Sequence, residues 1–154
     1  MPRNLMPLAA EGHGLAVLDF QDAVLGPIAY DPLSLVKDAF HGWSDARARA
    51  WLTRYHARAA AAGLPVPALE RFLWDADLIG IQRHLKVLGI FARLKHRDGK
   101  DRYIADAARF LGYLEDVLPR HPALADLAWV IRERVRPVFD ARAAEARAAA
   151  AAGA

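Results

Sequence analysis

The stretch NLMPLAAEGHGLAVLDF, residues 4–20, decides how the fold begins. It contains two short apolar runs on either side of the glycine-containing segment 9–14. Two such runs around a short loop predict a β-hairpin. A loop of residues 9–14 pairs the runs so that Asn4 lies opposite Asp19 at the open end of the hairpin. Because directly opposite residues have Cβ atoms about 4.5–5.5 Å apart, we expect this amide and this carboxylate to converge.

From Tyr30 onward the sequence pattern is helical. Asp31 before Pro32 marks a helix start with Asp31 as the N-cap, and Ser44 caps the next helix, whose buried stripe includes Trp51. Further helices are expected from Ser44 to about Ala62, from Pro67 to about Leu94 with a break near Asp75, from Asp101 to about Leu118, and from Pro122 to about Val135. The predicted fold class is mainly α, a short β-hairpin followed by a helical bundle.

The composition fits one globular domain or a part of one. The 154 residues are 55% hydrophobic, with no cysteine and a net charge of +3. No apolar run approaches the roughly 20 residues of a membrane span, and the N-terminus lacks the pattern of a signal peptide. We therefore expect a cytoplasmic protein with no membrane partner. The small basic excess, without interleaved aromatic residues, argues against nucleic acid as a partner.

The chain divides by composition into two parts. Residues 1–137 carry the hairpin and the periodic helices, whereas residues 138–154 form a tail rich in alanine and arginine. The tail has helical composition but no apolar stripe that could dock. We expect it to be solvated or frayed.

The side chains of Asn4 and Asp19 are the candidates for metal ligation. Mg²⁺ prefers oxygen ligands and keeps several waters, and one Asn and one Asp, together with substrate phosphates, hold it in nucleotide-dependent phosphotransferases. The alternative is that Asn4 caps a turn and Asp19 ends a strand, and the spacing alone leaves both open. The histidines lack zinc-ligand spacing and no serine lies in a glycine-flanked elbow.

Two groups of motifs are similar to those of a known kinase family. The first comprises NLM (4–6), VLDFQDA (17–23), Gly26-Pro27 and Tyr30-Asp31, and resembles the C-terminal lobe of the aminoglycoside phosphotransferase-like kinases. The second, QRHLKVLGIFARL (82–94) with RDGK (97–100) and Arg102-Tyr103, resembles the branch of anomeric N-acetylmuramate and N-acetylglucosamine kinases of cell-wall recycling. The resemblance covers about residues 2–118. It implies the C-terminal lobe of a protein-kinase-like fold, with ATP and Mg²⁺ as cofactors.

The resemblance also implies roles for four residues. Asn4 matches the asparagine that ends the kinase catalytic loop, and Asp19 matches the aspartate of the Asp-Phe-Gly element, so both are expected to be Mg²⁺ ligands. Asp31 matches a structural aspartate and is expected, as a helix N-cap, to brace the catalytic loop. Asp22 is a candidate carboxylate just outside the metal ligands, or a solvated loop acid.

The resemblance implies an incomplete kinase. The kinase catalytic loop has four residues between its aspartate and its asparagine, so the catalytic aspartate falls two positions before Met1, and no residue of the chain takes that role. The N-terminal lobe that clamps ATP is also missing from these residues. We expect a truncated gene product or a mis-assigned start, negligible turnover, and self-association through apolar surface that the N-terminal lobe covers in a full kinase.

The acceptor is expected to be an amino sugar. Arg83 and Lys86 are three residues apart on one helix face and are candidate acceptor contacts, with a solvated basic face as the alternative. Trp43 is the candidate for stacking on a sugar ring. The basic residues around Arg83 favour a neutral or anionic sugar over a polycationic aminoglycoside. The rival hypothesis is a non-catalytic helical module that binds a sugar or a partner.

Overall fold

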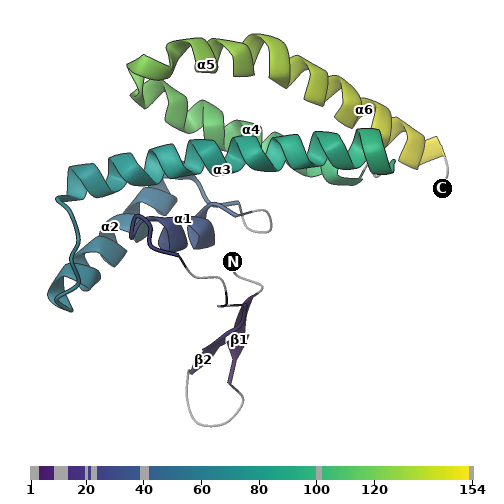
Figure 1. The fold of residues 1–154 in the computed structure, drawn as a ribbon. Coiled ribbons are helices and arrows are strands. Elements are labelled where there is room, and N and C mark those ends of the chain that lie inside the picture. Colours follow the sequence, from purple (N-terminus) through teal and green to yellow (C-terminus); the bar gives the residue numbers. More distant parts are fainter. Residues whose placement is uncertain are drawn as a thin grey trace. The chain divides into compact units, whose positions relative to one another are not determined.

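The computed structural model describes residues 4–8, 14–19, 21, 24–38, 42–99 and 102–152. A two-stranded hairpin, β1 (Leu5–Pro7) and β2 (Leu15–Val17), is followed by helices (Figure 1). They are α1 (Tyr30–Val36), α2 (Asp45–Ala61), α3 (Leu69–Asp98), α4 (Arg102–Val117), two 3₁₀ turns (Leu118–Arg120 and Pro122–Leu124), α5 (Ala125–Val130), a π-helical turn (Ile131–Val135) and α6 (Arg136–Ala152). The prediction of a mainly α fold that begins with a short hairpin is confirmed.

The chain forms two compact units, Met1–Ala76 and Asp77–Ala154. The first unit holds the hairpin, α1, α2 and the start of α3, and the second holds the rest of α3 and the helices that follow. Among the described residues, no helix is long and apolar enough to cross a membrane.

The hairpin is antiparallel, but its register differs by one residue from the prediction. The strands pair Leu5 with Val17 and Pro7 with Leu15, and the Leu18 N–H donates to the Asn4 carbonyl at 2.8 Å. Asn4 therefore lies opposite Leu18 and not opposite Asp19. The predicted loop of residues 9–14 was one residue too long, because Gly14 belongs to the ladder and accepts from the Leu8 N–H at 2.9 Å.

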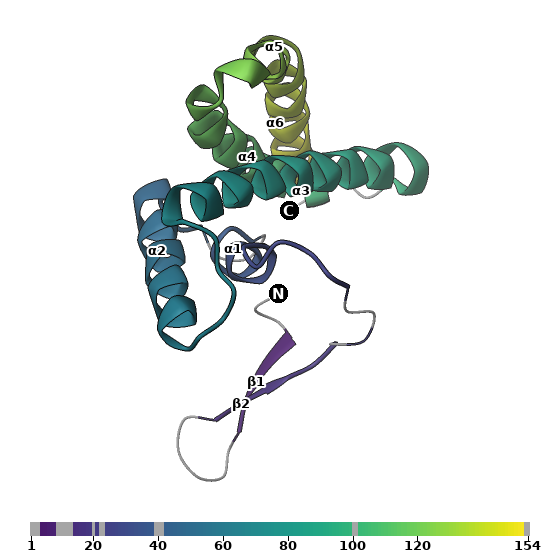
Figure 2. The same ribbon diagram turned by 60° about the vertical axis from the view of Figure 1, so that its left-hand side comes forward.

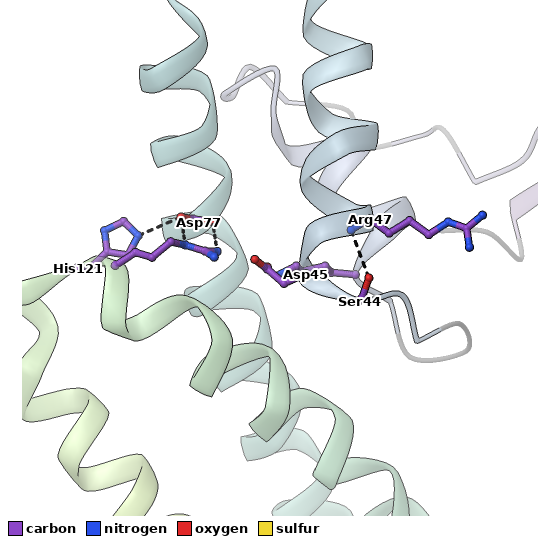
Figure 3. Close-up of polar contacts among 7 residues, drawn as sticks. Ser44, Asp45, Arg47, Asp77 and His121 are labelled. Atoms are coloured by element: carbon purple, nitrogen blue, oxygen red, sulfur yellow. Dashed lines mark hydrogen bonds and ion pairs between the residues drawn. The ribbon is translucent and has the colours of Figure 1, made fainter.

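The first unit packs α1 and α2 together around buried side chains from both helices and from α3, namely Leu33, Ala48, Leu52, Ala59 and Phe72. Helix α2 begins as predicted, because the Ser44 hydroxyl accepts from the Arg47 N–H at 3.3 Å (Figure 3). It ends at Ala61, and Gly63 just beyond has a φ of +77°, a left-handed conformation that glycine adopts without strain. The buried Lys37 ammonium joins the two helices through an ion pair of 2.6 Å with Asp45.

The prediction that Asp31 is an N-cap was wrong. Helix α1 begins at Tyr30 with Ala29 as the N-cap residue, and Asp31 is the exposed second residue of the helix. Pro32 is still tolerated, because the first turn of a helix has N–H groups without intrahelical acceptors. The Asp31 carboxylate there interacts favourably with the positive end of the helix dipole.

Two other helix predictions were also wrong. Trp51 was expected in the core, yet it is 47% exposed while its neighbour Leu52 is buried. Helix α3 was expected to break near Asp75, yet it is continuous from Leu69 to Asp98 (Figure 2). Asp75 lies within the helix and accepts from the Arg71 guanidinium at 2.9 Å, an i,i+4 pair that stabilises a helix.

The second unit has an aromatic core between α3 and α4. Leu111 and Leu114 are fully buried, and the buried His84 ring lies 5.6 Å from Phe110 and 4.9 Å from Tyr113, measured between ring centroids. These spacings are typical of aromatic pairs in cores. His84 is thus a packed core histidine.

A buried polar cluster lies near the end of α4. The Asp77 carboxylate accepts two hydrogen bonds from the Arg120 guanidinium, both at 3.1 Å. The His121 Nε2–H donates to the same carboxylate at 3.3 Å (Figure 3). The cluster connects α3 to the turn that follows α4.

The C-terminal segment was expected to be solvated or frayed and to have nothing to dock; it is mostly exposed, but it is helical and docks. Helix α6 continues to Ala152 and packs against α4, and its residue Ala143 is buried. The Arg136 guanidinium donates to Asp140 at 2.9 Å and to Glu115 of α4 at 3.0 Å. The hydrogen bond to Asp140 is the main reason why the pKa of Arg136 is raised above its ordinary value.

Candidate functional site

The open end of the hairpin brings Asn4 and Asp19 together. The Asn4 Nδ2–H donates to the Asp19 Oδ2 at 2.9 Å, although the two residues are 15 positions apart. Asn4 precedes β1 and Asp19 follows β2, so the hairpin itself positions the pair. The two polar side chains meet as the sequence predicted, but through a different backbone geometry.

That geometry depends on the backbone of Asp19. Successive side chains of a strand point to opposite faces, so a shift of one residue moves a side chain to the wrong face. Asp19 has a φ of 58°, which is left-handed and leaves the extended conformation of β2. Aspartate tolerates this conformation better than most residues. The left-handed residue redirects the carboxylate toward Asn4 despite the shifted register.

The sequence analysis did not select Gln21, which also contacts this carboxylate. Its Nε2–H donates to the Asp19 Oδ1 at 3.3 Å, so both oxygens of Asp19 accept a side-chain hydrogen bond. The only signal in the sequence is its position two residues after the aspartate. An amide there neutralises no charge and leaves Asp19 its full negative charge.

The donor set fits Mg²⁺. Asn4 and Asp19 offer an amide oxygen and a carboxylate, the hard oxygen ligands that this ion prefers, and the exposure of Asp19 leaves room for the waters that it keeps. The carboxylate has about four lone-pair positions, so it can accept two hydrogen bonds and still ligate a cation. Within the described ranges, no cluster of three or more His, Asp or Glu side chains could hold a metal. An ion here would rely on phosphate oxygens and water.

The remaining predicted site residues are Asp22, Arg83, Lys86 and Trp43. Asp22 falls outside the described residues. Arg83 and Lys86 are on the part of α3 that belongs to the second unit, where Arg83 is half-buried and Lys86 is exposed. Trp43 precedes α2, and the Arg47 guanidinium lies 4.5 Å from its ring centroid.

The Gly26-Pro27 segment lines a cavity of about 330 Å³ in the first unit. Pro65, Pro67 and Phe72 form much of the opposite wall, and the Asp75 carboxylate adds a polar group. The loop between the hairpin and α1 therefore shares this cavity with the linker between α2 and α3.

The sequence matches known phosphotransferases. Residues 1–64 match the phosphotransferase enzyme family. The chain is 53% identical over 134 residues to an N-acetylmuramate/N-acetylglucosamine kinase of Pseudomonas putida, a match that covers 86% of this chain and 39% of the relative. The chain is therefore similar to this phosphotransferase family over its first 64 residues and to the kinase over most of its own length.

Two further relatives carry the same name. The kinase of Pseudomonas aeruginosa is 55% identical over 128 residues, which are 82% of this chain and 37% of the relative. The kinase of Neisseria meningitidis is 51% identical over 120 residues, which are 77% of this chain and 36% of the relative. The chain thus spans less than two fifths of these relatives. No solved structure gives a significant match.

Proposed function

We propose that the chain is the C-terminal lobe of an ATP-dependent amino-sugar kinase that phosphorylates N-acetylmuramate or N-acetylglucosamine at the anomeric hydroxyl. The relatives named for these two sugars support the acceptor class. The observation that carries the proposal is the hydrogen bond of 2.9 Å between Asn4 and Asp19, since these are the residues that match the metal ligands of the kinase motifs.

In this proposal Asn4 and Asp19 hold the Mg²⁺ that accompanies ATP. The ion supplies a positive charge that neutralises the transferring phosphate. Asp19 contributes negative charge, Gln21 restrains its carboxylate, and Asn4 contributes the second oxygen. Asp31 contributes to the first turn of α1 and takes no part in binding the ion.

We further propose that this polypeptide has negligible turnover by itself. Phosphoryl transfer needs an aspartate that accepts the proton of the sugar hydroxyl and a Gly-rich lobe that covers the phosphates. Neither motif is among the 154 residues. The chain therefore supplies the metal-binding end of the reaction and needs a further segment for the chemistry.

The proposal predicts metal-dependent nucleotide binding by the chain. Calorimetric titration with ATP is expected to show binding in Mg²⁺ that disappears in excess chelator. Asn4→Ala and Asp19→Ala are each expected to weaken it about tenfold or more, the scale on which metal sites respond to lost supporting groups. Glu70→Gln, an exposed acid in the first turn of α3, is the matched control and should change nothing.

Two results would contradict the metal role. One is ATP binding that is equally strong in chelator. The other is binding that Asp19→Ala and Glu70→Gln weaken equally. Sugar binding that persists without any nucleotide binding would instead support a non-catalytic module.

The exposed apolar residues predict self-association. Val24 and Leu25 are almost fully exposed, and the hairpin exposes Leu15, Val17 and Leu18 as well. A two-stranded sheet also leaves both edges open to pairing. We expect sedimentation velocity to show a concentration-dependent increase in mass, reduced by the double change Val24→Ser and Leu25→Ser. Val138→Ser, on the exposed side of α6, is the control, and a chain that stays monomeric at high concentration contradicts the prediction.

A further inference from the structure

One face of helix α2 combines the exposed Trp51, Arg54 and Arg58 with the half-buried Tyr55, whose ring stacks on Phe72 at 6.1 Å between centroids. Trp51, Arg54, Tyr55 and Arg58 follow each other at intervals of three, one and three residues, which places them on one side of a helix. They line a groove of about 470 Å³ whose other walls are Ala59, Ala62 and Leu64. This volume lies in the range of small-molecule sites, roughly 300–1,000 Å³.

The exposure of Trp51 needs an explanation. The helix buries Ala48 and Leu52 instead, so the fold does not use the indole for its core. The Arg54 guanidinium lies 5.5 Å from the Trp51 ring centroid, within the range of a cation–π contact. The contact holds a positive charge beside the aromatic surface of the groove.

The charge of the groove favours an anion. Helix α2 contains four arginines and a single acid, Asp45, which is already paired with Lys37. Among the described residues, no carboxylate forms an ion pair with Arg54 or Arg58. Two guanidinium groups therefore face the groove with their capacity for carboxylate or phosphate unused, and guanidinium binds such groups in a planar, two-point manner.

We propose that this groove on α2 binds an anionic sugar, with the pyranose ring against Trp51 and Tyr55 and its carboxylate or phosphate on Arg54 and Arg58. The aromatic rings offer the apolar surface that the C–H face of a pyranose needs, and the arginines select for charge. The site shares no residue with the Asn4–Asp19 pair. It goes beyond the proposed phosphoryl transfer as a separate ligand site.

The test compares two sugars that differ by one charged group. N-acetylmuramate carries a lactyl carboxylate that N-acetylglucosamine lacks. In ¹H–¹⁵N spectra of the tryptophan indoles of the 154-residue chain, N-acetylmuramate is expected to shift the Trp51 signal with a dissociation constant of about 1 mM. We expect N-acetylglucosamine to bind about tenfold more weakly, because exposed charge contacts add only modest affinity. N-acetylglucosamine 1-phosphate shows whether phosphate replaces the carboxylate.

Variants locate the site. The double change Arg54→Gln and Arg58→Gln is expected to remove the preference for the charged sugar. Trp51→Ala is expected to lower the affinity for both sugars by a similar factor. Arg71→Gln is the matched control, because Arg71 also lies over an exposed tryptophan, Trp74, at 5.0 Å. Circular dichroism checks that each variant keeps its helices.

Three results would overturn the proposal. They are equal affinity for the two sugars, no shift of the Trp51 signal up to about twentyfold above the expected dissociation constant, and an Arg54/Arg58 variant that behaves like Arg71→Gln. The ATP titration tests the metal site and the indole titration tests this groove, so either proposal can fail without the other. Glu70→Gln, which lies in neither site, should leave sugar binding unchanged.

Discussion

Replacement of Asp77 by alanine is expected to lower the free energy of unfolding of the second unit by about 3 kcal/mol. The carboxylate accepts both hydrogen bonds of the Arg120 guanidinium and one from His121. The side chain of Asp77 is only 11% exposed and that of His121 only 8%. Without Asp77, the Arg120 guanidinium and the His121 imidazole lose this carboxylate in a poorly solvated position. Arg120 is 31% exposed, which places the effect at the lower end of the range for buried ion pairs.

Urea unfolding followed by circular dichroism measures this effect. Asp77→Asn keeps the shape of the side chain. Its free energy of unfolding should lie between those of the wild type and the alanine variant, since the amide oxygen still accepts a hydrogen bond but the group carries no charge. Asp140→Ala is the control, because it removes a carboxylate of the same unit that forms a surface ion pair with Arg136. It is expected to lower the free energy of unfolding by less than about 1 kcal/mol. Equal losses for Asp77→Ala and Asp140→Ala would show that the cluster adds no more than a surface ion pair.

Asp19→Asn is expected to lower kcat about a thousandfold in a phosphotransferase that contains this chain. The assay uses an in-frame fusion of an N-terminal lobe from one of the related kinases to the chain, with N-acetylmuramate and Mg²⁺·ATP. This is the size of the effect when an enzyme loses one electrostatic interaction that stabilises the transition state in a site that excludes water. The structure gives the effect a geometric reason, because the Asp19 carboxylate, on a left-handed backbone, accepts from Asn4 at 2.9 Å.

Two further variants of the fusion serve as controls. Gln21→Ala removes a single hydrogen bond of 3.3 Å to Asp19, so a loss of about tenfold or less is expected. Asp31→Asn changes an exposed helix residue and should leave kcat unchanged within a factor of about two. A fusion in which Asp19→Asn and Asp31→Asn have the same kcat would refute the metal role. An inactive wild-type fusion would refute the proposal that the chain completes a kinase.

The sequence predicted the hairpin because apolar runs and glycines are local signals. It did not predict the register, because the register depends on the number of residues in the loop. From the sequence, Gly14 could be the last residue of the loop or the first paired residue of the second strand. The Asn4–Asp19 contact was predicted from an incorrect pairing. It forms because Asp19 adopts a left-handed conformation, and a period-two pattern carries no information about that.

The helices show the same limit. Ser44 caps α2 through its own hydroxyl and Gly63 acts through its own backbone, so both are local signals and were predicted correctly. Trp51 was placed in the core because it is large and apolar, but the burial of Leu52 decides which side of α2 faces inward. The cluster of Asp77, Arg120 and His121 joins residues more than 40 positions apart, so no local pattern could reveal it.

The π-helical turn at Ile131–Val135 separates two helical phases. The backbone N–H of Arg136 bonds to the Ile131 carbonyl, five residues back, so the turn takes up one residue more than an α-helical turn. One extra residue offsets the angular position of every later side chain by about 100°, the rotation per residue of a regular helix. The inward-facing positions of α5 and α6 therefore follow two different phases. A single 3.6-residue repeat drawn through both helices cancels the signal that each carries alone.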